Sequence, residues 1–280
     1  MIDYRTLRST PHPQMVYATI DEKIHKNSST ERWYLMIAVL SPSKTMREES
    51  FDLETTEPKF KNDAKKLAQV LRKYDVADLM ALMKISEKLA VQNFDRFKGF
   101  NKAETYPAAW LFHGDVFNGV AIDDFTEEDI IYAQKHIRVL SGMYGILRPL
   151  DAIRPYRLEM GTKLSTEKGN NLYDYWGHKV QKELTKIPEA DLLVNLASKE
   201  YAKVLDLKSI QIPVLEVEFM EIRKGRPVGI PLFSKTARGR MARWMVKEQA
   251  ETKDDLKGFD YDGYEFSGDL SDDWKYVFTR

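Results

Sequence analysis

Short apolar runs and longer amphipathic stretches alternate along the chain after residue 35. Residues 35–40 and 192–196 are short, apolar and followed by polar residues, a pattern typical of buried strands. Residues 214–220, with alternating Val and Leu, predict a further strand. Residues 108–112 predict a second short strand, and weaker strand patterns occur at residues 228–233 and 274–278.

Helical periodicity fills much of the sequence between these runs. Apolar side chains at helical spacing predict helices at residues 62–73, 76–96 (as one or two helices), 172–184 and 236–250. Thr126 and Asp129 form a capping pattern that begins another helix. The apolar stripe of that helix continues through Ile137 and Leu140, so we expect it to end at Gly142.

Strands scattered among helices predict a mixed α/β (α+β) fold in a single domain, with a mixed sheet and surrounding helices. Residues 1–35 show little periodicity and contain a turn-forming run at residues 27–30. We therefore expect an N-terminal extension over residues 1–35 and one domain over residues 36–280.

Composition excludes several kinds of chemistry. The chain of 280 residues has no cysteine, which rules out thiolate catalysis, Cys-ligated zinc and iron–sulfur clusters. Its five histidines form no i, i+4 pair with a carboxylate partner, so we predict no metal site and no cofactor. No apolar run approaches the ~20 residues of a membrane span, and residues 1–30 hold no signal-peptide core. We expect a cytoplasmic protein without a membrane partner, and assume a monomer.

Charge is balanced overall but segregated along the chain. The 43 basic and 43 acidic residues cancel, yet residues 222–247 hold eight basic residues and no acid, and residues 248–274 hold ten acids. Such segregation can place a positive patch on a neutral protein. The alternative is a solvated basic helix followed by an acidic tail.

Two hydroxyl- or glycine-rich turns are candidate anion sites. Ser41-Pro-Ser-Lys44-Thr45 follows the first predicted strand, where a hydroxyl-rich turn with a lysine suits phosphate; otherwise it is a polar surface turn. Gly142 and Gly145 lie between the capped helix and Pro149, which suits the first turn of another helix. This resembles a helix–hairpin–helix element, which brings backbone N–H groups to a nucleic-acid phosphate. The usual hairpin has Gly-x-Gly, and an ordinary helix–helix turn remains the alternative.

Two further segments combine polar groups with a strand end or an aromatic ring. Arg154, Tyr156 and Arg157 suit phosphate contact plus base stacking, unless Glu159 pairs with an arginine as a structural ion pair. Residues 195–201 place polar groups after a predicted strand, where α/β sheets bind ligands, although Ser198 also suits a helix N-cap.

The helix after Ser234 carries a basic stripe. Thr236, Arg240, Arg243 and Lys247 share one face beside an apolar face that contains Met241. This pattern is typical of a helix that packs its apolar face on the core and binds a ligand with its outer face. It is equally typical of a plain amphipathic helix.

Several strings together resemble the YaaA peroxide-stress family. They are SPSKT at 41–45, LMKISEKLA at 82–90, GDVFNG at 114–119, the run 140–161, LYDYWG at 172–177 and the segments 195–201, 235–243 and 258–259. The resemblance extends from about Met36 to the C-terminus, and Ser43 stands where close relatives often carry alanine. It implies a cytosolic bacterial protein of the peroxide-stress response that limits iron-mediated DNA damage. It further implies one α/β domain with a helix–hairpin–helix element beside a positive cleft that binds DNA.

Two functions of different classes follow. The first is structure-preferring or weakly sequence-specific DNA binding, because phosphate contacts position DNA but do not read its sequence. The expected contacts are Lys44, Arg148, Arg154, Arg157, Lys199, Arg238, Arg240 and Arg243, with Gly142 and Gly145 as hairpin glycines.

The second function is that of an enzyme acting on a nucleotide, nucleobase or damaged DNA. Lys44 or Lys199 would be the nucleophile or phosphate holder, Glu159 or Asp174 the acid/base, and Asn195 would orient the substrate. The sequence does not establish catalytic activity.

Overall fold

The computed structural model describes residues 35–49, 53–188 and 190–280. These residues belong to one compact unit, Tyr34–Arg280. The predicted N-terminal extension, apart from its last residue, lies outside the described residues.

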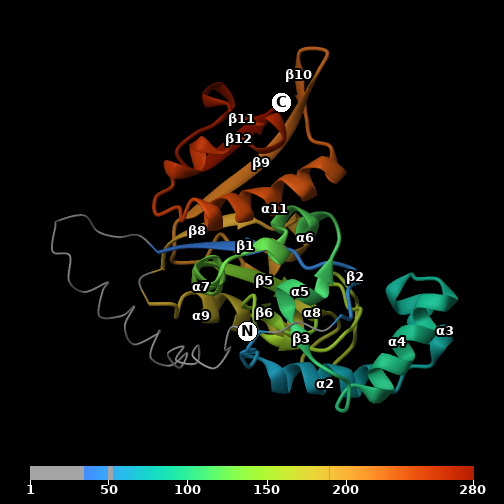
Figure 1. The fold of residues 1–280 in the computed structure, drawn as a ribbon. Coiled ribbons are helices and arrows are strands. Elements are labelled where there is room, and N and C mark those ends of the chain that lie inside the picture. The colour runs from blue at the N-terminus through green and yellow to red at the C-terminus, as the bar shows by residue number, and fades with distance from the viewer. Residues whose placement is uncertain (1–34, 50–52, 189) are drawn as a thin grey trace, which may run out of the picture. The chain divides into compact units, whose positions relative to one another are not determined.

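A mostly parallel sheet forms the centre of the fold (Figure 1). Its strands follow the order β11-β12-β9-β8-β1-β5-β6, and β10 pairs with β9. All pairs from β12 to β5 along this order are parallel, whereas β6, β10 and β11 pair antiparallel with their neighbours. The strands are β1 Leu35–Leu40, β5 Ile137–Ser141, β6 Gly145–Leu147, β8 Ala190–Leu196, β9 Val214–Arg223, β10 Arg226–Val228, β11 Glu265–Phe266 and β12 Lys275–Thr279.

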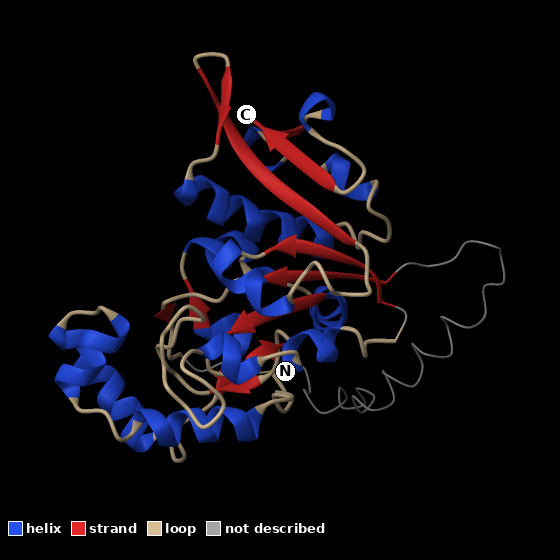
Figure 2. Ribbon diagram, turned by 180° about the vertical axis from the view of Figure 1, so that it is seen from behind, coloured by secondary structure: helices blue, strands red, loops and turns tan. Residues whose placement is uncertain are grey.

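The burial of the strands explains their sequence patterns. β1 lies between β8 and β5, and its residues from Met36 to Leu40 are buried, as expected for a central parallel strand covered on both faces. β9 instead alternates, with Leu215, Val217 and Phe219 buried and the residues between them more exposed. β9 continues past the end of its pairing with β8 and carries β10 as a hairpin (Figure 2).

Helices pack around this sheet and connect its strands. The described helices of the α type are α2 Lys61–Leu71, α3 Val76–Met83, α4 Glu87–Gly99, α5 Ala108–Leu111, α6 Asp115–Val120, α7 Glu127–His136, α8 Leu172–Trp176, α9 Lys179–Leu184, α10 Lys199–Ala202 and α11 Pro231–Lys247. α11 crosses α6 with almost no space between the backbones. A Cβ on Gly239 would lie 1.8 Å from the carbonyl oxygen of Val116, and one on Gly119 would lie 2.4 Å from that of Thr236. Only glycine permits this contact.

Two small antiparallel sheets hold the long connections. β2 (Thr45–Met46) pairs with β4 (Phe112–His113), and β3 (Tyr106–Pro107) pairs with β7 (Ala152–Ile153). The first pair anchors the turn after β1 beside the start of α6, where Ser43 Oγ donates to the carbonyl of His113.

The structure confirms the predicted fold class and most of its elements. The strands predicted at residues 35–40, 192–196, 214–220 and 274–278 correspond to β1, β8, β9 and β12. The helix predicted from the Thr126–Asp129 capping pattern is α7, with both reciprocal cap hydrogen bonds formed. The helix predicted at residues 172–184 is divided into α8 and α9 at Gly177, whose φ of 46° lies in the left-handed region.

The helix–hairpin–helix prediction is wrong for the two-glycine segment. α7 ends at His136, and residues 137–141 pair with β1 and β6 as strand β5. Gly142 and Gly145 therefore belong to a β-hairpin, in which Gly145 pairs with Ser141 and has a φ of 71°. A short apolar run beside the central strand gains more from sheet pairing than from one further helical turn.

Two further strand predictions are also corrected. Residues 108–111 form helix α5, and only Phe112 of the predicted strand is extended, in β4. The predicted strand at 228–233 ends at Val228, because Pro231 begins α11. Proline at the first helical position is favourable, since the N–H that it lacks would have no helical partner.

Candidate functional site

The order of the strands places a topological switch point between β1 and β8. From β1 the chain proceeds to β5 on one side, whereas β8, β9 and β12 follow on the other side of β1 (Figure 1). The segments that leave the carboxyl ends of β1 and β8 therefore diverge. In open α/β sheets, ligands bind in the crevice at this point.

Ser41 and Ser198 meet at this switch point. Ser41 Oγ accepts a hydrogen bond from the backbone N–H of Ser198 at 2.9 Å and donates to its Oγ at 3.2 Å. Ser198 occupies the N-cap position of α10, as the alternative interpretation of the sequence expected, but its side chain makes no capping hydrogen bond. The contact fixes the two diverging turns side by side.

Lys44, Arg157 and Glu159 form an ion-paired group beside the serines. Lys44 Nζ lies 2.7 Å from Glu159 Oε2, and an Arg157 guanidinium nitrogen lies 3.2 Å from Glu159 Oε1. The Lys44 side chain is 61% exposed, whereas that of Arg157 is only 17% exposed, and its buried Nε has no hydrogen-bond partner among the described residues. Arg157 is therefore fixed in place, and Lys44 extends to the surface.

Segments 41–45, 154–161 and 195–201 converge around a narrow hollow. Its lining includes Lys44 and Pro42 from the first, Tyr156 and Glu159 from the second and Tyr201 from the third. The hollow measures about 10 Å³, room for about one water molecule. A larger ligand would therefore contact this place from the surface.

Buried tyrosines form the floor beneath this group. The Tyr156 hydroxyl lies 2.7 Å from Ser141 Oγ, at the end of β5, and Ser141 also accepts from the N–H of Tyr144. Tyr156 is 3% exposed and packs edge-on against Phe112, so it is not available for the base stacking expected from the sequence. Burial raises the pKa of Tyr156 and of Tyr201, which keeps both hydroxyls neutral.

Two carboxylates position the segment after β8. Asn195 donates to Glu216 Oε2 on β9 at 2.8 Å, and its Oδ1 accepts from the N–H of Ala197. Glu200 accepts from the N–H of Gly161 at 2.9 Å. Lys199, between these anchors, is exposed and makes no ion pair with another described residue.

The arginines of α11 do not join this group as free cations. Arg240 pairs with Asp262 of the acidic segment at 3.1 Å. Arg243 contacts both oxygens of Asp124 at 2.7 Å, and one of its nitrogens also donates to the carbonyls of residues 120 and 121. Arg238 is half-buried: desolvation lowers its pKa, Glu216 and Glu218 act in the opposite direction, and its Nε has no described partner.

Arg148 and Arg154 lie at other places in the fold. Arg148 donates to Asp151 through Nε and Nη2, and Arg154 donates to the carbonyl of Ala103 with its guanidinium over Phe100. Neither lines the hollow. The structure thus brings together three of the eight predicted cations, Lys44, Arg157 and Lys199, and not the other five.

Sequence reasoning missed the pairing of the two serines and the burial of Tyr156. Both depend on how segments distant in the sequence pack together. The one available signal for the serine pair was that Ser41 and Ser198 each follow a predicted strand. Among the described residues, no group of three or more His, Asp or Glu side chains could hold a metal ion. In the same part of the chain, no helix has the length and apolar character needed to cross a membrane.

Known proteins are similar to this chain over nearly the whole region that the structure describes. Residues 36–270 match the family described as peroxide stress protein YaaA. A UPF0246 protein of Dinoroseobacter shibae is 43% identical over 256 residues, covering 88% of this chain and 95% of its own. UPF0246 proteins of Ruegeria pomeroyi and Caulobacter vibrioides are each 42% identical over 252 residues, covering 88% of this chain and 98% and 99% of theirs. The chain therefore belongs to the YaaA peroxide-stress protein family.

Proposed function

We propose that this protein acts in the bacterial response to peroxide by binding DNA at the carboxyl edge of its sheet and limiting iron-mediated damage there. The observation that carries the proposal is the gathering of Lys44, Arg157 and Lys199, from three distant segments, around the contact between Ser41 and Ser198. The proposal includes a cytoplasmic location.

The accessibility of these cations supports a surface ligand. Lys44 and Lys199 are exposed, and the hollow beside them is too small to enclose a nucleotide. The ion pair between Lys44 and Glu159 is an exposed one, which contributes about 0–1 kcal/mol, so a phosphate can displace Glu159 at little cost. Lysine contacts to phosphates carry no sequence information, and we therefore expect structure-preferring or weakly sequence-specific binding.

The contacts of the other five predicted cations reduce the number of residues that can bind DNA phosphates. Arg148, Arg154, Arg240 and Arg243 hold loops or the acidic segment, and half-buried Arg238 lies in the field of Glu216 and Glu218 on β9. In this proposal these five maintain the fold, and the phosphate contacts come from Lys44, Arg157 and Lys199.

Titration of labelled single-stranded, duplex and nicked DNA against the full chain tests the proposal. Three phosphate contacts predict that the logarithm of the binding constant falls with the logarithm of salt concentration with a slope of about −2.7. Protection of plasmid DNA from nicking by Fe²⁺ and peroxide tests whether the protein limits iron-mediated damage. No binding to any of the three DNA forms at about 50 mM salt would contradict the proposal of DNA binding.

A second candidate function is an enzyme acting on a nucleotide, nucleobase or damaged DNA. It is favoured by Glu159, a carboxylate held between Lys44 and Arg157, an arrangement suited to acid/base work beside a phosphate. Asp174, the other proposed acid/base, binds Asn171 instead. Borohydride trapping of a lysine adduct with abasic DNA, with Lys44→Ala and Lys199→Ala as separate variants, tests this function. Absence of an adduct and of turnover on common nucleosides would count against it.

A further inference from the structure

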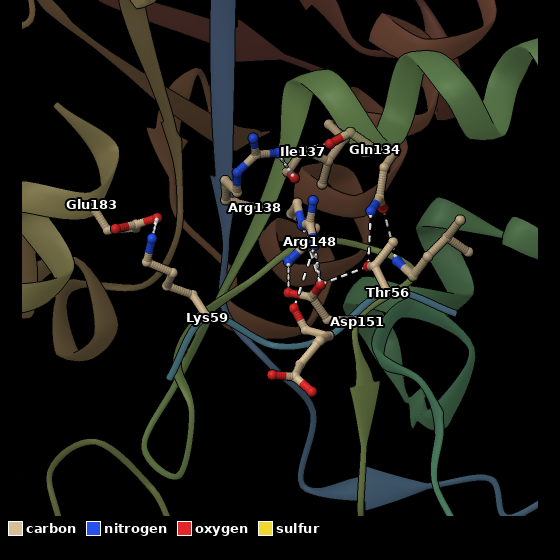
Figure 3. Close-up of polar contacts among 10 residues, drawn as sticks. Thr56, Lys59, Gln134, Ile137, Arg138, Arg148, Asp151 and Glu183 are labelled. Atoms are coloured by element: carbon tan, nitrogen blue, oxygen red, sulfur yellow. Dashed lines mark hydrogen bonds and ion pairs between the residues drawn. The ribbon is translucent and has the colours of Figure 1, made fainter. Parts of the chain in front are cut away.

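A second cavity, of about 380 Å³, lies beside β5 and β6, and its volume is within the range of small-molecule sites. Arg138, the second residue of β5, lines it, whereas Ser141, in the floor of the switch-point site, is the last residue of the same strand. Arg148, Asp151 and the residues around Glu183 complete its wall. Figure 3 shows Lys59 and Glu183 on one side of this region and Arg138 and Arg148 on the other.

Most charges in this wall are neutralised by a neighbour. Lys59 pairs with Glu183 at 3.4 Å, and Arg148 pairs with the buried Asp151 at 3.0 Å (Figure 3). Glu57, the third acid of the wall, pairs with Lys61 from the adjacent helix α2. These pairs leave two wall cations, Arg138 and Lys186, with no ion pair to another described residue.

Arg138 is the unusual one, because it is also mostly buried. One of its nitrogens, Nη1, donates to the carbonyls of Gln134 at 3.0 Å and Ile137 at 2.8 Å. Its Nε and Nη2 have no hydrogen-bond partner among the described residues. Burial, together with the positive charge of Arg148, lowers the pKa of Arg138 to about 10. Asp151 and Glu183 act on Arg138 in the opposite direction through charge alone, without a hydrogen bond, so its Nε–Nη2 edge is available to an anion in the cavity.

We propose that this cavity binds a small monocarboxylate, held by the Nε–Nη2 edge of Arg138. That edge presents two parallel N–H donors, the geometry that matches a carboxylate. Four cationic and three acidic side chains line the cavity, so a single negative charge neutralises it. A phosphate monoester would bring close to two negative charges beside Asp151 and Glu183. Glu183, whose pair with Lys59 is long at 3.4 Å, favours a ligand whose far end carries hydroxyl or ammonium groups.

Calorimetric titration of the full chain with lactate, 4-hydroxybutyrate and 4-aminobutyrate tests this site, with inorganic phosphate and butylamine as comparison probes. We expect saturable one-to-one binding of at least one carboxylate. Arg138→Gln should weaken that binding at least tenfold, whereas Arg223→Gln, the same change on the exposed β9–β10 hairpin, should leave it unchanged. No saturable carboxylate binding, tighter binding of phosphate, or equal binding by Arg138→Gln would overturn the proposal.

Two further variants cover the case in which Arg138→Gln does not fold. Arg138→Lys keeps the charge but loses the two-donor edge, so carboxylate affinity should still fall several-fold. Glu183→Gln removes the carboxylate facing the far end of the ligand, and should weaken 4-aminobutyrate more than lactate. Wild-type affinity in Arg138→Lys, or an equal loss for both ligands in Glu183→Gln, would overturn the assignment.

Discussion

The backbone N–H of Ser198 donates to Ser41 Oγ at 2.9 Å, across 157 residues of sequence and between the carboxyl ends of β8 and β1. This hydrogen bond fixes Lys44 and Lys199, three and one residues beyond the two serines, at the same edge of the sheet. The role that we propose for the protein depends on this placement. Each of the following predictions tests one part of the arrangement.

Glu159→Gln should strengthen DNA binding. The substitution removes a negative charge that competes with phosphate for Lys44 and Arg157, and the pair with exposed Lys44 alone predicts a gain of about two- to fivefold. Fluorescence anisotropy with duplex DNA measures it. Glu265→Gln, on exposed strand β11 at the far edge of the sheet, is the matched control and should have no effect. Weaker binding by Glu159→Gln, or loss of a catalytic turnover, would favour the enzyme instead.

Gly239→Ala should destabilise the fold strongly. The new Cβ would lie 1.8 Å from the carbonyl oxygen of Val116, so α11 and α6 would have to separate. Overpacking of this kind costs about 1–3 kcal/mol or more. Gly229→Ala is the matched control, because nothing lies within 4 Å of a Cβ there. Urea unfolding compares the two, and equal midpoints would refute the close helix contact.

Arg243→Ala should reduce stability while leaving DNA affinity nearly unchanged. The guanidinium joins α11 to both oxygens of Asp124 and to the carbonyls of residues 120 and 121. Loss of charged hydrogen bonds predicts a decrease of about 1.5–3 kcal/mol in the free energy of unfolding. A large loss of DNA affinity with wild-type stability would instead show that Arg243 contacts DNA.

His136 should make the fold less stable in mild acid. Its ring stacks on Tyr132 and its Nδ1 contacts the carbonyl of Met36, and burial lowers its pKa to about 4 from the ordinary 6.5. Between these values the unfolded chain binds the proton and the folded chain does not. Stability is therefore full above about pH 6.5 and falls as the pH drops towards 4, by up to about 3 kcal/mol.

Urea midpoints measured between pH 4 and 8 for wild type and His136→Gln test this dependence. The variant should lose the part of the slope that lies between pH 6.5 and 4. His178→Gln, the same change at an exposed position, is the matched control. Equal slopes in His136→Gln and wild type would show that other groups cause the acid sensitivity.

Local patterns predicted those parts of the fold that depend on local physics. β1 and β8 were predictable because short apolar runs ending in polar residues are typical of buried parallel strands. The start of α7 was predictable from the reciprocal cap of Thr126 and Asp129. The end of α7 was not, because Ile137 and Leu140 fit a helical stripe and a strand equally well, and pairing with β1 decides between them.

The candidate site was predictable only in part. Lys44 and Lys199 followed from their position after predicted strands, which sheet topology brings together. The partners of Arg240 and Arg243 were not, because Asp262 lies 22 residues away and Asp124 lies 119 residues away, and no periodic pattern links them. A basic stripe in a sequence therefore gave no information on which of its cations are already neutralised.

The most direct test of the central claim is a DNA titration of the Lys44→Ala/Lys199→Ala double variant at several salt concentrations. If both lysines contact phosphates, the variant binds more weakly than wild type and the magnitude of its salt slope falls by about 1.8. Lys257→Ala/Lys275→Ala, two lysines each paired with an acid near the opposite edge of the sheet, provides the matched control. Affinity and slope equal to those of wild type would contradict the assignment of DNA binding to the carboxyl edge of β1 and β8.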